Sequence, residues 1–110
     1  GTDEWFRSVW GSSGTDVFAV GAGGRILHYD GSDWSTMTSD AGTWFECVWG
    51  SSGLDVFAVG GEGAVLHYDG SNWSRMISGT SVTLYGIWGS SDADVFAVGS
   101  SGTILHGAVE

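Results

Sequence analysis

The stretch from Val48 to Gly60 has the sequence VWGSSGLDVFAVG, and close copies of it begin 39 residues earlier and 39 residues later. The earlier copy is VWGSSGTDVFAVG from Val9, and the later one is IWGSSDADVFAVG from Ile87. A second string follows in the same register, as ILHYDGSDWSTM from Ile26 and VLHYDGSNWSRM from Val65. Self-similarity at a fixed period of this length is the signature of a repeat architecture.

The period divides the chain into three units, at residues 1–39, 40–78 and 79–110. Residues 5–39 and 44–78 are identical at 25 of 35 positions, which indicates recent duplication or design from a consensus. The third unit continues only as ILHGAVE from Ile104 and lacks counterparts of Asn72–Ser78. We therefore expect two complete units and a third that lacks its last strand.

Each unit predicts four short antiparallel strands. In the middle unit we expect them at 44–49, 55–59, 64–68 and 73–77, separated by turns at 50–53, 60–63 and Asp69-Gly70. The second strand, Val56–Val59, is apolar at every position, which is typical of a strand buried on both faces. Four-stranded antiparallel units of about 40 residues, covered on both sides, describe the blades of a β-propeller. The predicted fold is thus all-β, with almost three propeller blades per chain.

The composition excludes several classes of protein. The formal net charge is −10 with no lysine, which argues against binding to nucleic acid. The apolar runs are about four residues long, far short of the ~20 needed for a transmembrane helix, so we expect no membrane insertion. Cys47 is the only cysteine, so we expect a small, buried apolar residue there and no internal disulfide. The 20 glycines fit repeated tight turns, and the absence of proline fits strands that need every N–H group.

The repeated pattern resembles the Asp-box, or bacterial-neuraminidase-repeat-like, blades of secreted bacterial propellers, and is similar to the photosystem II assembly-factor propellers. The Asp30–Trp34 and Asp69–Trp73 segments correspond to the Asp-box, with a spacing one residue shorter. A looser likeness connects the chain to bacterial propeller lectins. The resemblance implies a propeller fold and an extracellular or periplasmic location. It does not imply one activity, because this blade type is widely reused.

Serine, aspartate and histidine recur together in every unit, as Ser12, Asp16 and His28, as Ser51, Asp55 and His67, and as Ser90, Asp94 and His106. These are the residue types of a catalytic triad. An active site needs one asymmetric constellation, however, and no nucleophile-elbow motif is present. We therefore expect a structural hydrogen-bond network repeated in each blade.

Glycosidase and metal-centre chemistry are also unsupported. A sialidase of the Asp-box type would need an arginine cluster, whereas Arg7, Arg25 and Arg75 occupy three different blade positions. The histidines lie one per unit in expected third strands away from the axis, so we predict no metal site and no cofactor. Asp30 and Asp33 are expected to stabilise their turn rather than bind Ca²⁺. The chain is predicted not to be an enzyme.

The tryptophans have two expected roles. Trp10, Trp49 and Trp88 end the expected first strand of every unit and are predicted to pack between blades. Trp34 and Trp73 follow the Asp-Gly turn, where they either pack under that turn or offer a stacking platform for a sugar. The candidate ligand-binding residues are Trp34, Trp73, Tyr29, Tyr68, Asp33 and Asn72. Repetition of such a site would multiply its avidity.

Fewer than three complete blades cannot close a ring, and blades bury their faces only against neighbours. We therefore predict a homo-oligomer, with six blades from two chains favoured over nine from three. The predicted function is a non-enzymatic propeller fragment that self-assembles, either a natural piece of a longer secreted propeller or a product of repeat design. The alternative is an oligomeric lectin that binds a glycan. The number of subunits depends on small angles between blades, which the sequence does not contain.

Overall fold

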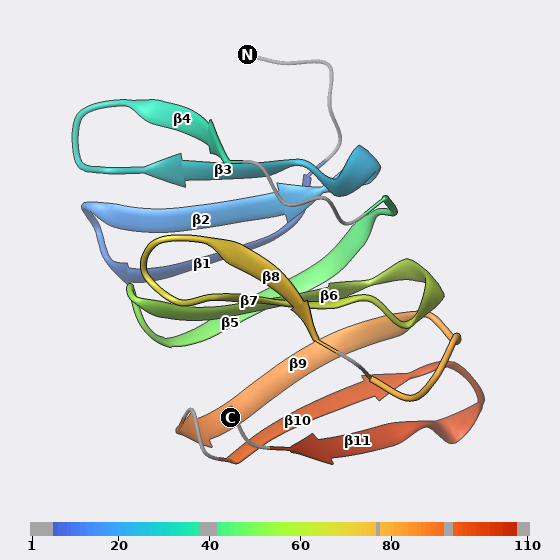
Figure 1. The fold of residues 1–110 in the computed structure, drawn as a ribbon. Coiled ribbons are helices and arrows are strands. Elements are labelled where there is room, and N and C mark those ends of the chain that lie inside the picture. Colours follow the sequence, from blue (N-terminus) through green and yellow to red (C-terminus); the bar gives the residue numbers. More distant parts are fainter. Residues whose placement is uncertain (1–5, 38–41, 77, 92–93, 108–110) are drawn as a thin grey trace.

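The computed structural model describes residues 6–37, 42–76, 78–91 and 94–107, and these form three antiparallel sheets (Figure 1). The first sheet holds β1 (Phe6–Ser13), β2 (Asp16–Gly21), β3 (Ile26–Tyr29) and β4 (Trp34–Met37). The second holds β5 (Phe45–Ser52), β6 (Asp55–Gly60), β7 (Val65–Tyr68) and β8 (Trp73–Met76). The third holds β9 (Leu84–Ser91), β10 (Asp94–Gly99) and β11 (Ile104–Gly107). The short 3₁₀ turns η1 (Ala22–Gly24), η2 (Gly61–Gly63) and η3 (Ser100–Gly102) join each second strand to the third.

The sheets stack in chain order, as Figure 1 shows. Within each sheet the strands also follow chain order, so every connection is a hairpin. Neighbouring sheets meet mainly through their first strands, with β1 beside β5 and β5 beside β9. The later strands of each sheet diverge from those of the next. The sheets therefore fan out as propeller blades do, and the predicted all-β blade architecture is confirmed.

The first hairpin differs from the sequence prediction. We expected Gly50–Gly53 to form a turn, but β5 continues to Ser52 and the turn contains only Gly53 and Leu54. The register shifts between Gly50 and Ser52, so the strand holds a β-bulge there. A bulge absorbs the extra residue without breaking the pairing, and this is why a Gly-Ser-rich segment remains in the strand.

The second hairpin turns through two residues with positive φ. In η2 these are Glu62 at 60° and Gly63 at 72°, and in η3 they are Ser101 at 59° and Gly102 at 72°. Two such residues define a type I′ turn, whose twist matches that of the flanking strands. Ala64, expected in the third strand, has φ −68° and closes this turn instead.

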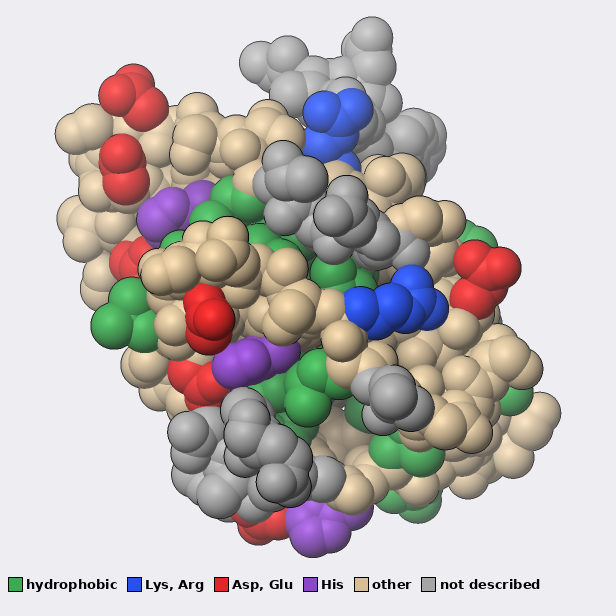
Figure 2. All heavy atoms as spheres, viewed as in Figure 1, with side chains coloured by type: hydrophobic (Ala, Val, Ile, Leu, Met, Phe, Trp, Pro, Cys, Tyr) green, Lys and Arg blue, Asp and Glu red, His purple; other side chains and the backbone are tan. Residues whose placement is uncertain are grey.

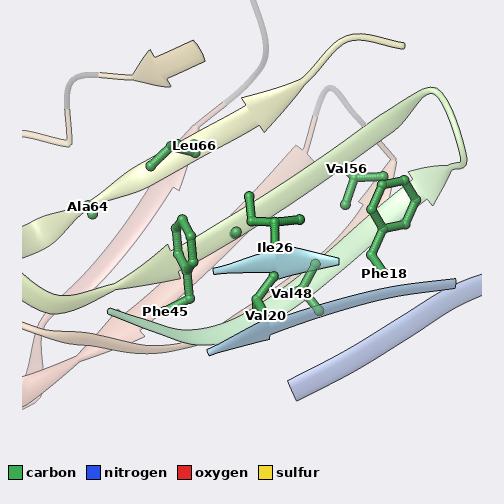
Figure 3. Close-up of a cluster of buried hydrophobic side chains, with 9 residues drawn as sticks. Phe18, Val20, Ile26, Phe45, Val48, Val56, Ala64 and Leu66 are labelled. Atoms are coloured by element: carbon green, nitrogen blue, oxygen red, sulfur yellow. The ribbon is translucent and has the colours of Figure 1, made fainter. Parts of the chain in front are cut away.

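The hydrophobic core lies between the sheets, one cluster at each junction. The first cluster, shown in Figure 3, joins Phe18, Val20 and Ile26 to Phe45, Val48, Val56, Ala58, Ala64 and Leu66 of the second sheet. The second cluster joins Phe57 and Val59 to Leu84, Ile87 and Ala97, with Cys47 partly buried against it. Every residue of Val56–Val59 is buried, as the unbroken apolar run predicts for a strand covered on both faces. The middle sheet thus packs against a neighbouring sheet on each of its two faces.

No helix in the described ranges is long and apolar enough to cross a membrane.

Candidate functional site

Among the described residues, the two outermost sheets each have one apolar face that no other sheet covers. We call the outer face of the first sheet the first end face, defined by Phe6, Val9, Leu27 and Trp34. The outer face of the third sheet is the second end face, defined by Trp88, Phe96, Val98 and Ile104. Every one of these residues is at least partly exposed. Exposed apolar side chains gathered on one face of a sheet are typical of an interaction site.

The internal repeat shows what covers such faces elsewhere in the chain. Val48 is 4% exposed at the first junction, whereas its counterpart Val9 on the first end face is 65% exposed. Ile26 is fully buried at the same junction, whereas its counterpart Ile104 on the second end face is 69% exposed. The two end faces therefore carry the two complementary halves of a junction that the chain forms twice internally.

A tryptophan against a glycine lies at the centre of each internal junction. A Cβ added at Gly50 would lie 2.8 Å from the Trp10 ring, and one at Gly89 would lie 2.9 Å from the Trp49 ring. Glycine is required there because the indole occupies the place of a side chain. The predicted packing role thus describes Trp10 and Trp49.

Trp88 differs from its two counterparts. It is 58% exposed, because no further blade follows the third within the described residues. Conversely, the nearest atoms to Gly11 belong to its own blade: the carbonyl oxygens of Ser13 and Asp16 and a methyl group of Val17. Trp88 and Gly11 are therefore the tryptophan and the glycine that this contact uses. Within the described residues, however, each lacks the other half of the pair.

The Ser–Asp–His sets form hydrogen-bond networks within their blades. In the first blade Ser12 Oγ donates to Asp16 Oδ2 at 2.5 Å, and His28 Nε2 lies 2.6 Å from Asp16 Oδ1. The second and third blades repeat the bond from histidine to aspartate, with His67 Nε2 2.5 Å from Asp55 Oδ1 and His106 Nε2 bonded to Asp94. Ser51 Oγ also donates to Asp55, while the side chain of Ser90 lies outside the described part. Histidine and acidic side chains accordingly lie side by side along the stack in Figure 2.

The order of these groups decides what they can do chemically. The carboxylate lies between the serine and the histidine, so the serine proton points at aspartate rather than at an imidazole nitrogen. A nucleophilic serine needs the imidazole as its base, and this arrangement does not supply it. The hydrogen bonds from His28 and Ser12 stabilise the ionised form and lower the pKa of Asp16. The network therefore ties the first hairpin of a blade to its third strand.

The network also reaches the next blade. A Cβ added at Gly53 would lie 2.1 Å from Asp16 Oδ2, so the carboxylate of the first blade lies directly against the turn of the second blade at its glycine. The His28 ring packs at 4.5 Å, centroid to centroid, against Phe18 of the first core cluster. The polar network and the apolar junction are thus one continuous structure.

In each Asp-Gly turn, the aspartate carboxylate accepts hydrogen bonds from backbone N–H groups of the same turn. Asp30 Oδ1 accepts the N–H groups of Ser32 and Asp33, both at 2.9 Å, and Asp69 Oδ1 accepts those of Ser71 and Asn72 at the same distance. These N–H groups lower the pKa of Asp30 and Asp69. Among the described residues, no group of three or more His, Cys, Asp or Glu is placed to hold a metal ion.

The two candidate sugar platforms occupy different environments. Tyr29 packs against Trp34, and Tyr68 against Trp73, each as a tilted ring pair with centroids 5.3 Å apart. Trp73 lies in the first junction, where its Nε1–H donates to Met37 Sδ at 3.4 Å. Trp34 instead lies on the first end face and is 50% exposed. Asp33 and Asn72 are exposed beside these rings, and sugar binding by any of these residues stays a prediction.

The three arginines lie apart. Arg7 on β1 forms an ion pair of 3.4 Å with Glu46 of the next blade. Arg25 follows η1, and Arg75 lies on β8. They therefore do not converge on one ligand.

Fanned antiparallel sheets of three or four strands, packed through their first strands, define a β-propeller segment, and solved structures agree. The structure titled "YCF48 bound to D1 peptide" matches with a TM-score of 0.82 and 20% identity, over 99% of this chain and 39% of that one. YCF48 from Cyanidioschyzon merolae matches with a TM-score of 0.82 and 18% identity, over 98% of this chain and 39% of that one. The structural similarity shows the propeller fold, and at these identities it shows the fold alone; the chain spans 39% of the length of either structure.

No family model and no curated protein matches the sequence. The Asp-box assignment therefore stays a prediction, while the blade architecture that it implies is confirmed by the fold.

Proposed function

We propose that this chain is a propeller segment that assembles head to tail with further copies of itself into a closed ring, without enzymatic activity. The observation that carries this proposal is the pair of end faces, which repeat the two halves of the internal junction. Val9 and Ile104 are exposed where their internal counterparts Val48 and Ile26 are buried. A contact between two different faces is heterologous, and it closes into a ring when the rotation per copy divides the circle.

The internal junction supplies the contacts expected between copies. Trp88 of one copy would lie on Gly11 of the next, as Trp10 lies on Gly50. Arg7, Glu46 and Tyr85 occupy equivalent positions, and at the first junction this position of one blade, Arg7, pairs with that of the following blade, Glu46. Between copies the Tyr85 ring would thus face the next Arg7 guanidinium, and a cation–π contact could replace the ion pair.

The ring size follows from the number of blades per chain. Each chain brings three sheets, so two copies supply six blades and three supply nine. We favour six, because known rings hold ~4–8 blades. Size-exclusion chromatography with light scattering should give a multiple of 11.5 kDa. A folded monomer at micromolar concentration would overturn the proposal.

A second candidate function, carbohydrate binding, is favoured by one observation. Trp34 offers a half-exposed indole backed by Tyr29, and such a face can stack on the apolar face of a sugar. On a broad glycan array, binding that is lost in Trp34→Ala and retained in Leu54→Ala would establish it. Absence of binding across the array would reject it. Either activity is compatible with the extracellular or periplasmic location that we propose from the resemblance to secreted propellers.

A further inference from the structure

The outer edge of the third sheet differs from those of the other two. In the first sheet β4 covers the edge of β3, and in the second β8 covers the edge of β7. In the third sheet β11 is the last strand among the described residues. Head-to-tail assembly would cover the faces of this sheet and would add no strand to its edge.

The backbone of β11 presents hydrogen-bonding groups at this edge. Gly99 N–H donates to the Thr103 carbonyl at 2.9 Å, so Thr103 directs its backbone groups toward β10. Because these directions alternate along a strand, Ile104 and His106 direct theirs to the open edge. Their counterparts in the first sheet, Ile26 and His28, stand opposite Met37 and Ser35 of β4. The two complete blades thus supply the register for a fourth strand.

The side chains around this edge are placed to contact a fourth strand of the pattern Trp-Ser-x-Met, which β4 and β8 share. In the second blade the strand's tryptophan donates to Met37 of the preceding blade. Met76 has the same position relative to the third blade, and it is partly buried in the second core cluster. The strand's methionine stands opposite Ile26, whose counterpart Ile104 is 69% exposed. A strand of this pattern would bring an indole to Met76 and a methionine to Ile104.

We propose that the edge of β11 binds an extended peptide of the pattern Trp-Ser-x-Met, which pairs antiparallel with Ile104–Gly107 as a fourth strand. Backbone hydrogen bonds supply affinity in such strand addition, and side chains on the two faces supply selectivity. Gly107 stands where the complete units carry Tyr29 and Tyr68, so the third blade has no tyrosine ring to stack on the incoming tryptophan. Met76 therefore gives the main contact for this tryptophan. The proposal uses one chain only and does not rest on ring assembly.

The test uses a fluorescently labelled peptide with the chain's own sequence from Asp69 to Met76, titrated with the full chain and followed by anisotropy. In β8, Ser74 stands opposite His67, and the alternation turns its N–H toward β7 and that of Arg75 away. N-methylation at Ser74 should therefore weaken binding at least tenfold, while N-methylation at Arg75 should leave it within twofold. Replacing the peptide's tryptophan by alanine should also weaken binding at least tenfold.

Hydrogen exchange locates the bound peptide. The Ile104 and His106 amides should gain protection, and the Leu105 amide, already directed at β10, should not change. Equal binding of the two N-methylated peptides, or protection confined to β3 or β7 through strand exchange, would overturn the proposal. The Val9→Asp chain, designed to block ring assembly, should bind the peptide as tightly as the parent, so failure of the ring and failure of the edge site are distinguishable.

Discussion

The Trp10 ring lies so close to Gly50 of the next blade that a Cβ at that glycine would come within 2.8 Å of it. The pair repeats as Trp49 and Gly89 one blade later. An indole on a glycine is thus the geometric unit by which one blade is placed on another. This contact makes the glycine a junction residue, although its position in a Gly-Ser segment suggests a turn.

We predict that Gly50→Ala lowers the stability of the chain. The added methyl group would also lie 2.8 Å from the Asp55 carbonyl, so neither the backbone nor the partly buried indole, packed against the first core cluster, can move away easily. Overpacking of this kind costs about 1–3 kcal/mol. Urea denaturation followed by tryptophan fluorescence should show a lower midpoint.

Gly14→Ala is the matched control for this substitution, and both changes are made in the Val9→Asp chain, because in an assembled ring Gly14 would meet Asp94 of the preceding copy as Gly53 meets Asp16. Gly14 occupies the turn of the same hairpin in the first blade, and nothing lies within 4 Å of its Cβ position. Its midpoint should be unchanged or slightly higher, because alanine reduces the entropy of the unfolded chain. Equal midpoints for Gly50→Ala and Gly14→Ala would contradict the proposed role of the glycine.

We predict that Val9→Asp and Ile104→Asp each prevent ring assembly. Val9 and Ile104 are 65% and 69% exposed within one chain, so neither carboxylate should disturb the blade that carries it. Between copies each would be buried without a partner, which is strongly unfavourable. Light scattering should report about one chain mass for either variant.

Leu54→Asp is the control, because it makes the same change at a residue that is 69% exposed and lies in a hairpin turn outside both end faces. It should assemble like the parent. Loss of assembly in only one of the two end-face variants would indicate that like faces meet, which is an isologous contact rather than the proposed head-to-tail one.

The repeat made the blade architecture predictable, because the 39-residue register aligns apolar strands and turns in every unit. The environment of each copy was not predictable in the same way. Trp34 and Trp73 occupy the same position in nearly identical segments, yet one lies on an end face and the other donates to Met37 in a junction. A repeated sequence encodes a repeated blade, while the burial of a side chain depends on whether another blade covers the face that carries it.

The residues that form each Ser–Asp–His set were predictable from the sequence, whereas the spatial order of the three side chains was not. The sequence places Ser12, Asp16 and His28 in one unit without stating which side chain lies in the middle. The β-bulge in the first strand, which the Gly-Ser composition conceals, accompanies the placement of Ser12 beside Asp16. The signal that could reveal this order is the short spacing of four residues across a hairpin.

We predict that Asp16 contributes stability that depends on pH. Its folded pKa lies below the unfolded value, because Ser12 and His28 form hydrogen bonds to the carboxylate. The contribution is therefore present above the unfolded pKa of ~3.9 and is lost as the pH falls through the lower folded pKa. Asp16→Asn should lower stability at pH 6 by about 1–2 kcal/mol and flatten the acid limb of a plot of stability against pH.

Asp33→Asn is the control for this titration. It removes one exposed carboxylate from the same blade, away from the network. Urea midpoints measured from pH 6 to pH 2.5 should follow the parent curve. If Asp16→Asn retains the parent's full acid dependence, the network does not supply it, and the turn carboxylates Asp30 and Asp69, whose pKa values are also lowered, become the source.

We predict that Glu62→Asn stabilises the chain. Glu62 has φ 60° in the type I′ turn between β6 and β7, where the corresponding residue of the first blade is Gly23. A left-handed conformation costs most residues about 1–2 kcal/mol, and asparagine tolerates it because its side chain bonds locally. The expected gain is ~0.5–1 kcal/mol, measured as a higher urea midpoint.

Glu62→Gln separates this backbone effect from the loss of a negative charge in a chain with a net charge of −10. Glutamine removes the charge and keeps the unfavourable conformation, so it should gain less than asparagine. Ser101→Asn repeats the test in the third blade, where Ser101 has φ 59° and no charge is removed. A gain in Glu62→Gln equal to that in Glu62→Asn, together with no gain in Ser101→Asn, would assign the effect to electrostatics instead of to the turn.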